Sequence, residues 1–201
     1  MPLDWQGGER VRHFAERLRD IRHCPVAAPD GLNATLRPYQ LEGVSWMQAL
    51  RQLEVGGILA DDMGLGKTLQ TLAHLLIEKQ STRLDRPAMV GMPPSLVPNW
   101  QDEAARFAPA LKVLALHGAT RKKHFAHLAE YDVLLTTYAL LPKDTEVLEQ
   151  VPLHILVLDE AQYIKTPGSK AAQAARQLNA RQRLCLSGTP LENHLGELWS
   201  L

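Results

Sequence analysis

The stretch that most constrains the fold of this chain runs from Gly56 to Thr68, with the sequence Gly-Gly-Ile-Leu-Ala-Asp-Asp-Met-Gly-Leu-Gly-Lys-Thr. A short apolar run leads into a glycine-containing loop, and the residues from Lys67 onward place leucines at helical spacing. A strand, such a loop and a helix in this order are typical of a phosphate-binding loop, in which backbone N–H groups and the helix N-terminus surround an anion. The stretch therefore predicts a P-loop and a nucleotide site.

The loop differs from the general spacing G-x-x-x-x-G-K-[ST] at one position, because Asp61 stands where the first glycine is expected. The alternative interpretation is a glycine-rich strand-to-helix turn that contains Lys-Thr by chance. If the loop binds phosphates, Lys67 contributes positive charge at the outer phosphates, and the Thr68 hydroxyl is placed to ligate Mg²⁺. The residues of this loop predicted to bind nucleotide are Asp62, Met63, Gly64, Leu65, Gly66, Lys67 and Thr68.

A second strong signal is the apolar run Ile155–Leu158, which ends in the adjacent carboxylates Asp159 and Glu160. Two like charges at the end of a buried strand need a cation or a catalytic water to stabilise them. Phosphoryl transfer would use Asp159 to hold Mg²⁺ through water and Glu160 to orient or deprotonate the attacking water. These two and Lys67 are the predicted catalytic residues, and Thr68 and Asp159 are the predicted metal ligands. The alternative is a helix N-terminus, where acidic residues are favoured.

Apolar runs alternate with helical patterns along the chain, which favours an α/β fold. Val133–Leu135 and Ile155–Leu158 are apolar at every position, as is typical of parallel strands covered by helices on both faces. We therefore expect a three-layer α/β/α sandwich with a mostly parallel sheet. Strands are expected at 55–60, 88–92, 112–116, 132–136, 154–158 and 183–187. Helices are expected at 9–22, from 38 through 50, at 67–79, through 100–107, at 120–129 and at 170–178.

Composition excludes few partners. The 22 basic and 22 acidic residues balance, so no overall excess indicates nucleic acid, although a local patch could bind phosphates. The concentrated basic run Arg121–His124 is expected to be a solvated helix face, with attraction of DNA as the alternative. Cys185 lies in an apolar run and is expected to be a buried thiol, which fits a reducing cytoplasm. No run reaches the roughly 18 apolar residues of a membrane span, so no membrane partner is expected.

These motifs together resemble those of one family. Asp159–Gln162 resembles motif II of the superfamily-two helicases in its DEAQ form. Asp61–Thr68 resembles motif I of the Swi/Snf-type ATPases, a branch of that superfamily that accepts an acidic residue at the position of Asp61. Five further segments resemble the family's motifs in the same order: Leu36–Val44 the adenine-reading Q segment, Pro93–Trp100 motif Ia, Leu116–Gly118 motif Ib, Thr136–Tyr138 the next nucleic-acid-contacting segment, and Leu186–Asn193 motif III.

The resemblance implies roles for the matching residues. Arg37 and Gln40 would read the adenine, with an exposed helix residue as the alternative for Gln40. Side chains and backbone groups at strand-to-helix junctions would hold a DNA backbone without reading its sequence, with helix caps as the alternative; these are Ser95, Asn99, His117, Gly118, Thr136 and Thr137. The residues that would couple loss of the γ-phosphate to movement, or otherwise form an ordinary turn before Pro190, are Gln162, Ser187, Gly188 and Thr189.

The similarity covers about residues 32–201 and implies an N-terminal RecA-like P-loop NTPase lobe, with residues 1–31 as a helical extension and linker. The helical pattern from Glu192 to Leu201 ends without a cap, so we expect a fragment that lacks the second RecA-like lobe. That lobe carries the family's arginine finger, which contributes about 10³–10⁵ in rate where it is used. The isolated chain is therefore expected to bind ATP weakly and to hydrolyse it poorly.

As a whole, the resemblance implies a DNA-dependent ATPase that uses ATP and Mg²⁺ to move on duplex DNA and to remodel protein–DNA complexes. The sequence leaves the cargo open between RNA polymerase, another DNA-bound protein and a nucleosome-like assembly. The expected location is the bacterial cytoplasm, at the nucleoid. Three alternatives stay open: a strand-separating DNA or RNA helicase, a P-loop kinase or simple nucleotide phosphatase, and a non-catalytic nucleotide-sensing module.

Overall fold

The computed structural model describes residues 26–54, 56–60, 66–166 and 168–188, without the side chains of residues 58–60. The helix predicted at 9–22 lies outside the described residues, and so do several residues of the predicted site: Asp61, Asp62, Met63, Gly64, Leu65 and Thr189. Predictions about these residues stay predictions. The division of the chain into an extension (1–31) and a lobe (32–201) also stays a prediction.

Six strands form one sheet in the order β1-β6-β5-β2-β4-β3, and every ladder in it is parallel. The strands are β1 (Gly57–Ala60), β2 (Ala88–Met92), β3 (Val113–Ala115), β4 (Val133–Thr137), β5 (Leu153–Leu158) and β6 (Ala180–Ser187). The central strands β2, β4 and β5 are buried at every position, which explains their unbroken apolar sequences. The predicted α/β class with a parallel sheet is confirmed.

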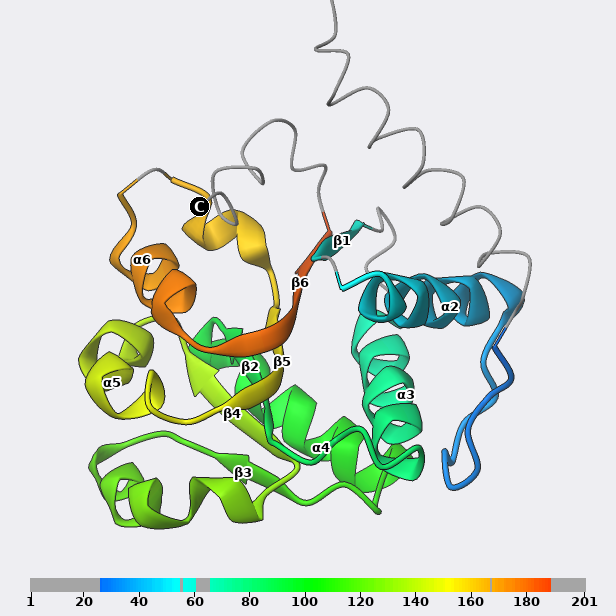
Figure 1. Ribbon diagram of the computed structural model, residues 1–201, viewed down its shortest axis with the longest axis horizontal. Coiled ribbons are helices and arrows are strands. Elements are labelled where there is room, and N and C mark those ends of the chain that lie inside the picture. The colour runs from blue at the N-terminus through cyan, green and yellow to red at the C-terminus, as the bar shows by residue number, and fades with distance from the viewer. Residues whose placement is uncertain (1–25, 55, 61–65, 167, 189–201) are drawn as a thin grey trace, which may run out of the picture.

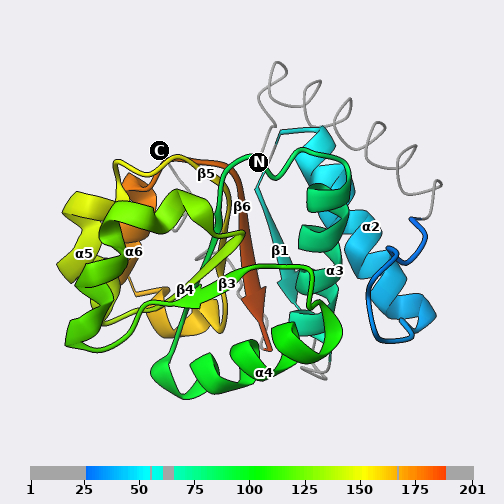
Figure 2. The same ribbon diagram turned by 90° about the horizontal axis from the view of Figure 1, so that it is seen from below.

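Helices cover both faces of the sheet, which lies between them in Figures 1 and 2. One face is covered by α2 (Pro38–Gln52), α3 (Lys67–Gln80) and α4 (Val97–Phe107), and the other by α5 (Leu140–Leu148) and α6 (Lys170–Gln177). The 3₁₀ segments are η1 (Pro94–Leu96), η2 (Ala119–Glu130) and η3 (Ala161–Ile164). No helix in the described part of the chain has the length and apolar character to cross a membrane.

Alternate residues of each central strand contribute to two separate cores. Met89 and Leu156 pack with α5 and α6, whereas their neighbours Val90 and Val157 pack with α2, α3 and α4. Successive side chains of a strand point to opposite faces, so a strand that is apolar at every position serves both cores. Cys185 lies in the first core as a buried free thiol, as its apolar surroundings in the sequence predict.

The sequence pattern predicts no element between residues 137 and 153, yet α5 occupies this segment. Pro142 weakens the helical pattern, but it lies in the first turn of α5, where a missing N–H leaves no hydrogen bond unmade. The buried positions Leu141 and Leu148 are two helical turns apart and anchor α5 on the sheet. Tertiary packing therefore determines this helix more than its local sequence does.

The basic run also differs from its prediction. It lies in η2, whose 3₁₀ turns are interrupted at His127 (φ −125°, ψ 17°). Lys122 and Lys123 are exposed as expected. Arg121 is buried instead: its Nε and Nη2 donate to the two carboxylate oxygens of Asp144 on α5, at 2.7 and 2.9 Å. The expected solvated face is therefore wrong for Arg121, which attaches η2 to the neighbouring helix.

A buried polar network holds the edge of the sheet at which the strands begin. His74 and Glu78 of α3 are fully buried beside Gln48 of α2. Gln48 Nε2 donates to His74 Nδ1 (2.8 Å), and His74 Nε2 donates to Gln182 Oε1 of β6 (2.9 Å), a pattern that requires the neutral imidazole. His154 Nε2 donates to Glu78 Oε1 at 2.8 Å. The network thus connects α2, α3, β5 and β6.

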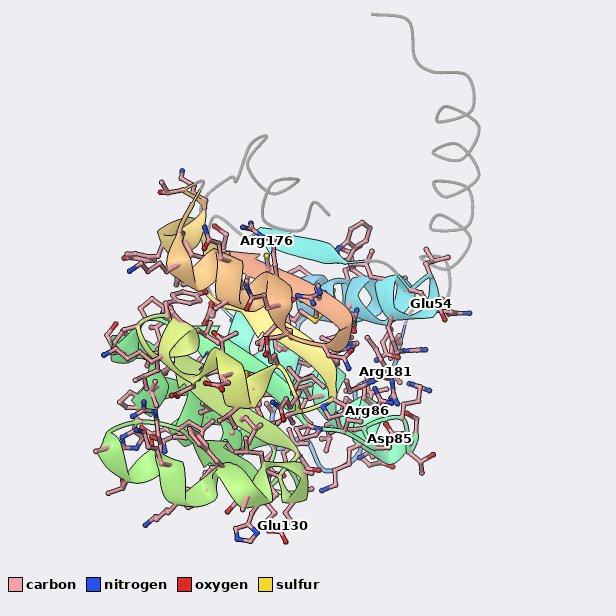
Figure 3. All side chains as sticks on the ribbon, turned by 60° about the vertical axis from the view of Figure 1, so that its left-hand side comes forward. Glu54, Asp85, Arg86, Glu130, Arg176 and Arg181 are labelled. Carbon is pink, nitrogen blue, oxygen red and sulfur yellow. The ribbon has the colours of Figure 1, made fainter. Side chains whose placement is uncertain are left out.

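Exposed charges surround this network. Arg181 Nη1 lies 2.6 Å from Asp85 Oδ1, and both are labelled on the side of the molecule near α2 and α3 in Figure 3. Arg51 and Arg83 approach Glu78 from the same side. Burial alone would raise the pKa of Glu78, but its hydrogen bonds from His154 and Arg83 hold that pKa below its ordinary value.

The first prediction concerns stability in acid. Burial lowers the pKa of His74 from 6.5 to about 4. Between pH 6.5 and 4, His74 is protonated in the unfolded chain but neutral in the folded chain. The free energy of unfolding should therefore fall as the pH is lowered through this range, by at most about 3 kcal/mol. Glu78 adds a further loss below the ordinary glutamate pKa, since its ionised form is stabilised only in the folded state. Denaturant unfolding at a series of pH values measures the slope.

His74→Gln should flatten the slope between pH 6.5 and 4, although it lowers stability at pH 7 through the lost hydrogen bonds. His127→Gln, at an exposed position of η2, is the matched control and should leave the slope unchanged. If the two variants flatten the slope equally, the neutral buried imidazole is not its source.

Candidate functional site

The residues predicted to bind phosphate and metal gather at one edge of the sheet. Because all strands are parallel, their carboxyl ends lie along the same edge, where ligands of such sheets bind. Lys67 follows β1, Asp159 follows β5, and Ser187 ends β6. These three strands are neighbours in the order β1-β6-β5, so segments more than 100 residues apart in the sequence meet there.

The Lys67 ammonium group is buried at this edge, with 4% of the residue exposed. Its Nζ has no hydrogen-bond partner among the described residues. A Cβ built on Gly188 would lie 3.4 Å from Nζ, which shows how closely the end of β6 approaches the ammonium. A buried charge without partners is costly, and an anion such as a phosphate would satisfy it. The geometry therefore fits the predicted role of Lys67.

Gln40 and Gly66 lie against each other at the start of α3. Gly66 has φ +87° and precedes α3, and a Cβ built on it would overlap the side-chain amide of Gln40. Gln40 is 7% exposed, and its Oε1 accepts a hydrogen bond from the Arg37 backbone N–H at 2.8 Å. The alternative of an exposed helix residue is therefore wrong for Gln40. Arg37 itself is exposed at the start of α2.

Asp159 is 5% exposed and held from several directions. Its Oδ2 accepts a hydrogen bond from Trp100 Nε1 at 2.8 Å, and its Oδ1 accepts one from the Glu160 backbone N–H at 2.8 Å. Its backbone N–H donates to Gly91 O at 2.8 Å, and the Tyr138 hydroxyl donates to its carbonyl oxygen. Both the backbone and the carboxylate of Asp159 are therefore fixed.

The surroundings of Asp159 affect its protonation in opposite directions. Burial raises the pKa of the carboxyl group, and the hydrogen bond from Trp100 and the positive charge of Lys67 oppose that rise. An oxygen-donor set of one carboxylate and the Thr68 hydroxyl suits Mg²⁺, which commonly takes its other ligands from phosphates and water. The described residues contain no cluster of three or more His, Cys, Asp or Glu side chains that could hold a metal without such help. The residues present therefore fit a magnesium ion bound with nucleotide.

A chain of side-chain hydrogen bonds joins the ends of β5 and β6. Ser187 Oγ, fully buried, donates to Gln162 Oε1 at 2.9 Å, and Gln162 Nε2 donates to the carboxylate of Glu160. Glu160 has φ +51°, an uncommon conformation for a non-glycine residue that is often found at functional sites. Three of the residues predicted to act in hydrolysis and coupling are thus in one connected group.

The residues predicted to contact DNA lie along the other half of the same edge, after β2, β4 and β3. Those with exposed positions are Ser95, Asn99, His117 and Gly118. Thr137 is 6% exposed and its hydroxyl accepts a hydrogen bond from the Leu140 N–H at the start of α5 (3.4 Å), which agrees with a helix-capping role. Thr136 is fully buried in β4, so a direct contact between its side chain and DNA does not fit this structure.

Comparisons with known proteins agree with these motifs. The family model described as the SNF2-related domain matches residues 39–201.

The chain belongs to the SNF2-related domain family.

Relatives of known sequence cover nearly all of the chain but are much longer than it. A Bacillus subtilis protein, YwqA, provisionally named an ATP-dependent helicase/translocase, is 46% identical over 197 residues, which are 96% of this chain and 21% of that protein. The TATA-binding protein-associated factor Mot1 of Saccharomyces cerevisiae is 37% identical over 207 residues, which are 96% of this chain and 11% of that protein. The chain thus spans between about a tenth and a fifth of these relatives.

A solved structure gives the fold comparison. The SWI2/SNF2 ATPase core of Sulfolobus solfataricus in complex with dsDNA is 43% identical, with a TM-score of 0.77 over 87% of this chain and 37% of that one. This similarity confirms the predicted RecA-like α/β lobe for the SNF2-related domain.

Three residues with clear structural roles in this SNF2-related domain were not predicted as site residues. Trp100 and Tyr138 hold Asp159. Arg121 fixes the loop that bears His117, because it pairs with Asp144 and its Nη1 donates to Gly118 O at 2.7 Å. Trp100 and Tyr138 lie inside motif segments, so the motifs marked their neighbourhood. Their partners are 59 and 21 residues away in the sequence, so the hydrogen bonds themselves become visible only in the fold.

The second prediction concerns the contact of Gly66 with Gln40. Gly66→Ala should destabilise the protein in two ways, through the positive φ, which costs alanine about 1 kcal/mol, and through overlap with the Gln40 amide, which adds roughly 1–3 kcal/mol. Gly168→Ala is the matched control, because Gly168 also has positive φ (+83°) but open space around an added Cβ. Denaturant unfolding of both variants measures the difference.

The double variant Gln40→Ala, Gly66→Ala should recover the overlap part of this loss. Equal destabilisation by Gly66→Ala and Gly168→Ala, with no recovery in the double variant, would contradict the predicted contact between Gln40 and Gly66.

Proposed function

We propose that this chain is the ATP-binding lobe of a DNA-dependent ATPase that moves along duplex DNA and remodels protein–DNA complexes. The observation that carries the proposal is the buried Lys67 ammonium, without a hydrogen-bond partner among the described residues, at the same sheet edge as Asp159 and Glu160. Membership of the SNF2-related domain family supports the class of motor. The Bacillus subtilis relative is provisionally named an ATP-dependent helicase/translocase, which supports ATP as the nucleotide.

In this proposal the residues divide the chemistry by their positions. Lys67 neutralises the outer phosphates, and Gly66 and the preceding loop surround them with backbone N–H groups. Mg²⁺, when bound with the nucleotide, neutralises charge that develops on the phosphates; Thr68 and Asp159 would hold it. Glu160 orients the attacking water and accepts its proton, because its carboxylate follows the strand that also positions Asp159. Gln40 reads the adenine with the support of Arg37.

Coupling is proposed to run through Gln162 and Ser187. Their hydrogen bonds connect Glu160 to the end of β6, so a change at the γ-phosphate alters the segment that includes Gly188 and Thr189. On the other half of the edge, the exposed residues Ser95, Asn99, His117 and Gly118 provide polar groups for the DNA backbone. Contacts of this kind carry little sequence information, which suits a motor that must move over any sequence. Thr136 and Thr137 are left out of this set because their side chains are buried.

Duplex DNA is the proposed nucleic-acid partner. The Sulfolobus relative, whose structure was solved in complex with dsDNA, supports this proposal. A second RecA-like lobe would supply an arginine finger and close the nucleotide site. The cargo would be a DNA-bound protein, with RNA polymerase as one candidate, and the place of action the bacterial nucleoid in the cytoplasm.

The decisive experiment measures the ATPase rate of the intact protein with duplex DNA, single-stranded DNA, RNA and no nucleic acid. Stimulation mainly by duplex DNA supports the translocase. Preference for a single strand or RNA would indicate a strand-separating helicase, and ATP hydrolysis indifferent to nucleic acid would indicate a phosphatase, while phosphoryl transfer to another acceptor would indicate a kinase. Absence of any turnover would favour a nucleotide-sensing module.

The third prediction concerns Glu160. Glu160→Gln in the intact protein should lower the DNA-stimulated ATPase rate by about 10²–10⁴, because the amide cannot accept the proton of the attacking water. Binding of ATP should change little, since Glu160 is not predicted to contact the phosphates directly. Glu130→Gln, on the exposed end of η2 and far from α2 in Figure 3, is the matched control and should keep the wild-type rate. Unchanged turnover in Glu160→Gln would contradict the assignment.

A further inference from the structure

Two side chains, Trp100 and Tyr138, donate hydrogen bonds to Asp159, and both come from the half of the sheet edge on which the predicted DNA contacts lie. Trp100 is in the first turn of α4, directly after Asn99. Tyr138 follows the end of β4, directly after Thr137. The residue predicted to hold the metal is therefore held by the elements predicted to bind DNA.

The contact between Trp100 and Asp159 is specific and well protected from water. Trp100 is 1% exposed, and its indole N–H, which can only donate, lies 2.8 Å from Asp159 Oδ2. The ring packs in the core beneath α3 and α4, so its position is fixed by that core. A rigid donor to one carboxylate oxygen determines where the other lone pairs of Asp159 point, as partners of metal-binding carboxylates generally do.

Tyr138 holds the same residue through its backbone. Its hydroxyl donates to the Asp159 carbonyl oxygen, and its own backbone N–H donates to Met92 O at 3.0 Å. Its ring lies against Gly91, where an added Cβ would come within 3.3 Å of the ring carbon Cε1. The glycine at this position of β2 lets the ring reach past the strand to Asp159. Movement at the end of β4 would therefore reach Asp159 through Tyr138.

The exposed side of α4 carries a side-chain hydrogen bond next to Trp100 in the sequence. Asn99 Nδ2 donates to Glu103 Oε2 at 2.7 Å, and Glu103 is half-buried one turn further along the helix. A DNA phosphate is a strong acceptor that would compete with Glu103 for the Asn99 amide. Because Trp100 is the next residue, a DNA phosphate bound at Asn99 would lie one residue from the donor to Asp159.

We propose that Trp100 and Tyr138 are positioning residues that connect DNA occupancy of the α4 and β4 segments to the placement of the Asp159 carboxylate. Neither residue touches nucleotide in this proposal, and each acts through Asp159. The inference rests on the proposed function, because it assumes that nucleotide with Mg²⁺ binds beside Asp159 and that DNA stimulates hydrolysis. It adds a physical route by which the two halves of the sheet edge are coupled.

The test compares Trp100→Phe and Tyr138→Phe with wild type in the intact protein. Trp100→Phe removes the N–H and keeps an aromatic ring in the core, and Tyr138→Phe removes one oxygen atom. Leu111→Ala is the matched control for lost packing: Leu111 is 5% exposed in the same core as Trp100 and has no hydrogen bond to Asp159. Two readouts are needed: ADP affinity with Mg²⁺ and with EDTA, and kcat and KM for ATP with and without duplex DNA.

We expect Trp100→Phe to reduce the Mg²⁺-dependent gain in ADP affinity by about tenfold and to leave the affinity in EDTA unchanged, since loss of a partner of a metal-binding group typically costs 10–100-fold. The stimulation of kcat by DNA should fall by a similar factor, with KM changed less. Tyr138→Phe should act in the same direction with a smaller effect. Leu111→Ala should keep the Mg²⁺ dependence and the stimulation of wild type.

Wild-type Mg²⁺ dependence and wild-type DNA stimulation in both Phe variants would overturn the inference, and so would an equal loss in Leu111→Ala. If Trp100→Phe does not fold, Tyr138→Phe decides the outcome because it leaves the packing almost intact. Failure of the proposed function has a different signature: wild type itself then shows no Mg²⁺-dependent ADP binding or no stimulation by DNA.

Discussion

The structure depends on two opposite charges, on Lys67 and Asp159, that are buried at the same edge of a parallel sheet. Taking a charge out of water is costly unless partners replace the lost hydration. Asp159 has such partners in Trp100 and the Glu160 N–H, whereas the Lys67 ammonium has no hydrogen bond among the described residues. Within the described residues, the Lys67 ammonium is thus left to bind an anion near a fixed carboxylate, which is the electrostatic condition for binding a phosphate together with a metal ion.

At the opposite edge of the sheet, buried ionisable groups have hydrogen-bond partners within the protein. There, Glu78 is as deeply buried as any charge in the described chain, but it receives hydrogen bonds from Gln48, Arg83 and His154. His74 is kept neutral by a donor on one ring nitrogen and an acceptor on the other. A satisfied network fixes α2 and α3 on the sheet. The network thereby holds α3, whose first residue is Lys67, firmly on the sheet.

The sequence predicts the parts of this molecule that depend on local pattern or on motif spacing. The apolar runs of β2, β4 and β5 give the parallel sheet, and the lysine after β1 and the paired acids after β5 give the two halves of the site. Helix α5 was missed because Pro142 and its polar neighbours conceal a short helix that packing stabilises. The burial of Arg121 and of Thr136 was missed because each depends on a partner or a layer contributed by distant sequence. Local pattern cannot distinguish an arginine on a solvated face from one that reaches a buried aspartate.

The order of the strands explains why one lobe can connect two ligands. Residues for nucleotide follow β1, β6 and β5, whereas residues proposed for DNA follow β2, β4 and β3, so the two sets divide the edge between β5 and β2. Asp159 lies at this boundary: it directly follows β5, and its N–H donates to Gly91 O of β2. A residue at the boundary is the shortest physical connection between the two sets, because both sides can contact it directly. Trp100 and Tyr138 make those contacts from the DNA side, and Glu160 makes its contact from the nucleotide side. Coupling in this lobe then needs no long pathway, only small movements around one carboxylate that is already held on all sides.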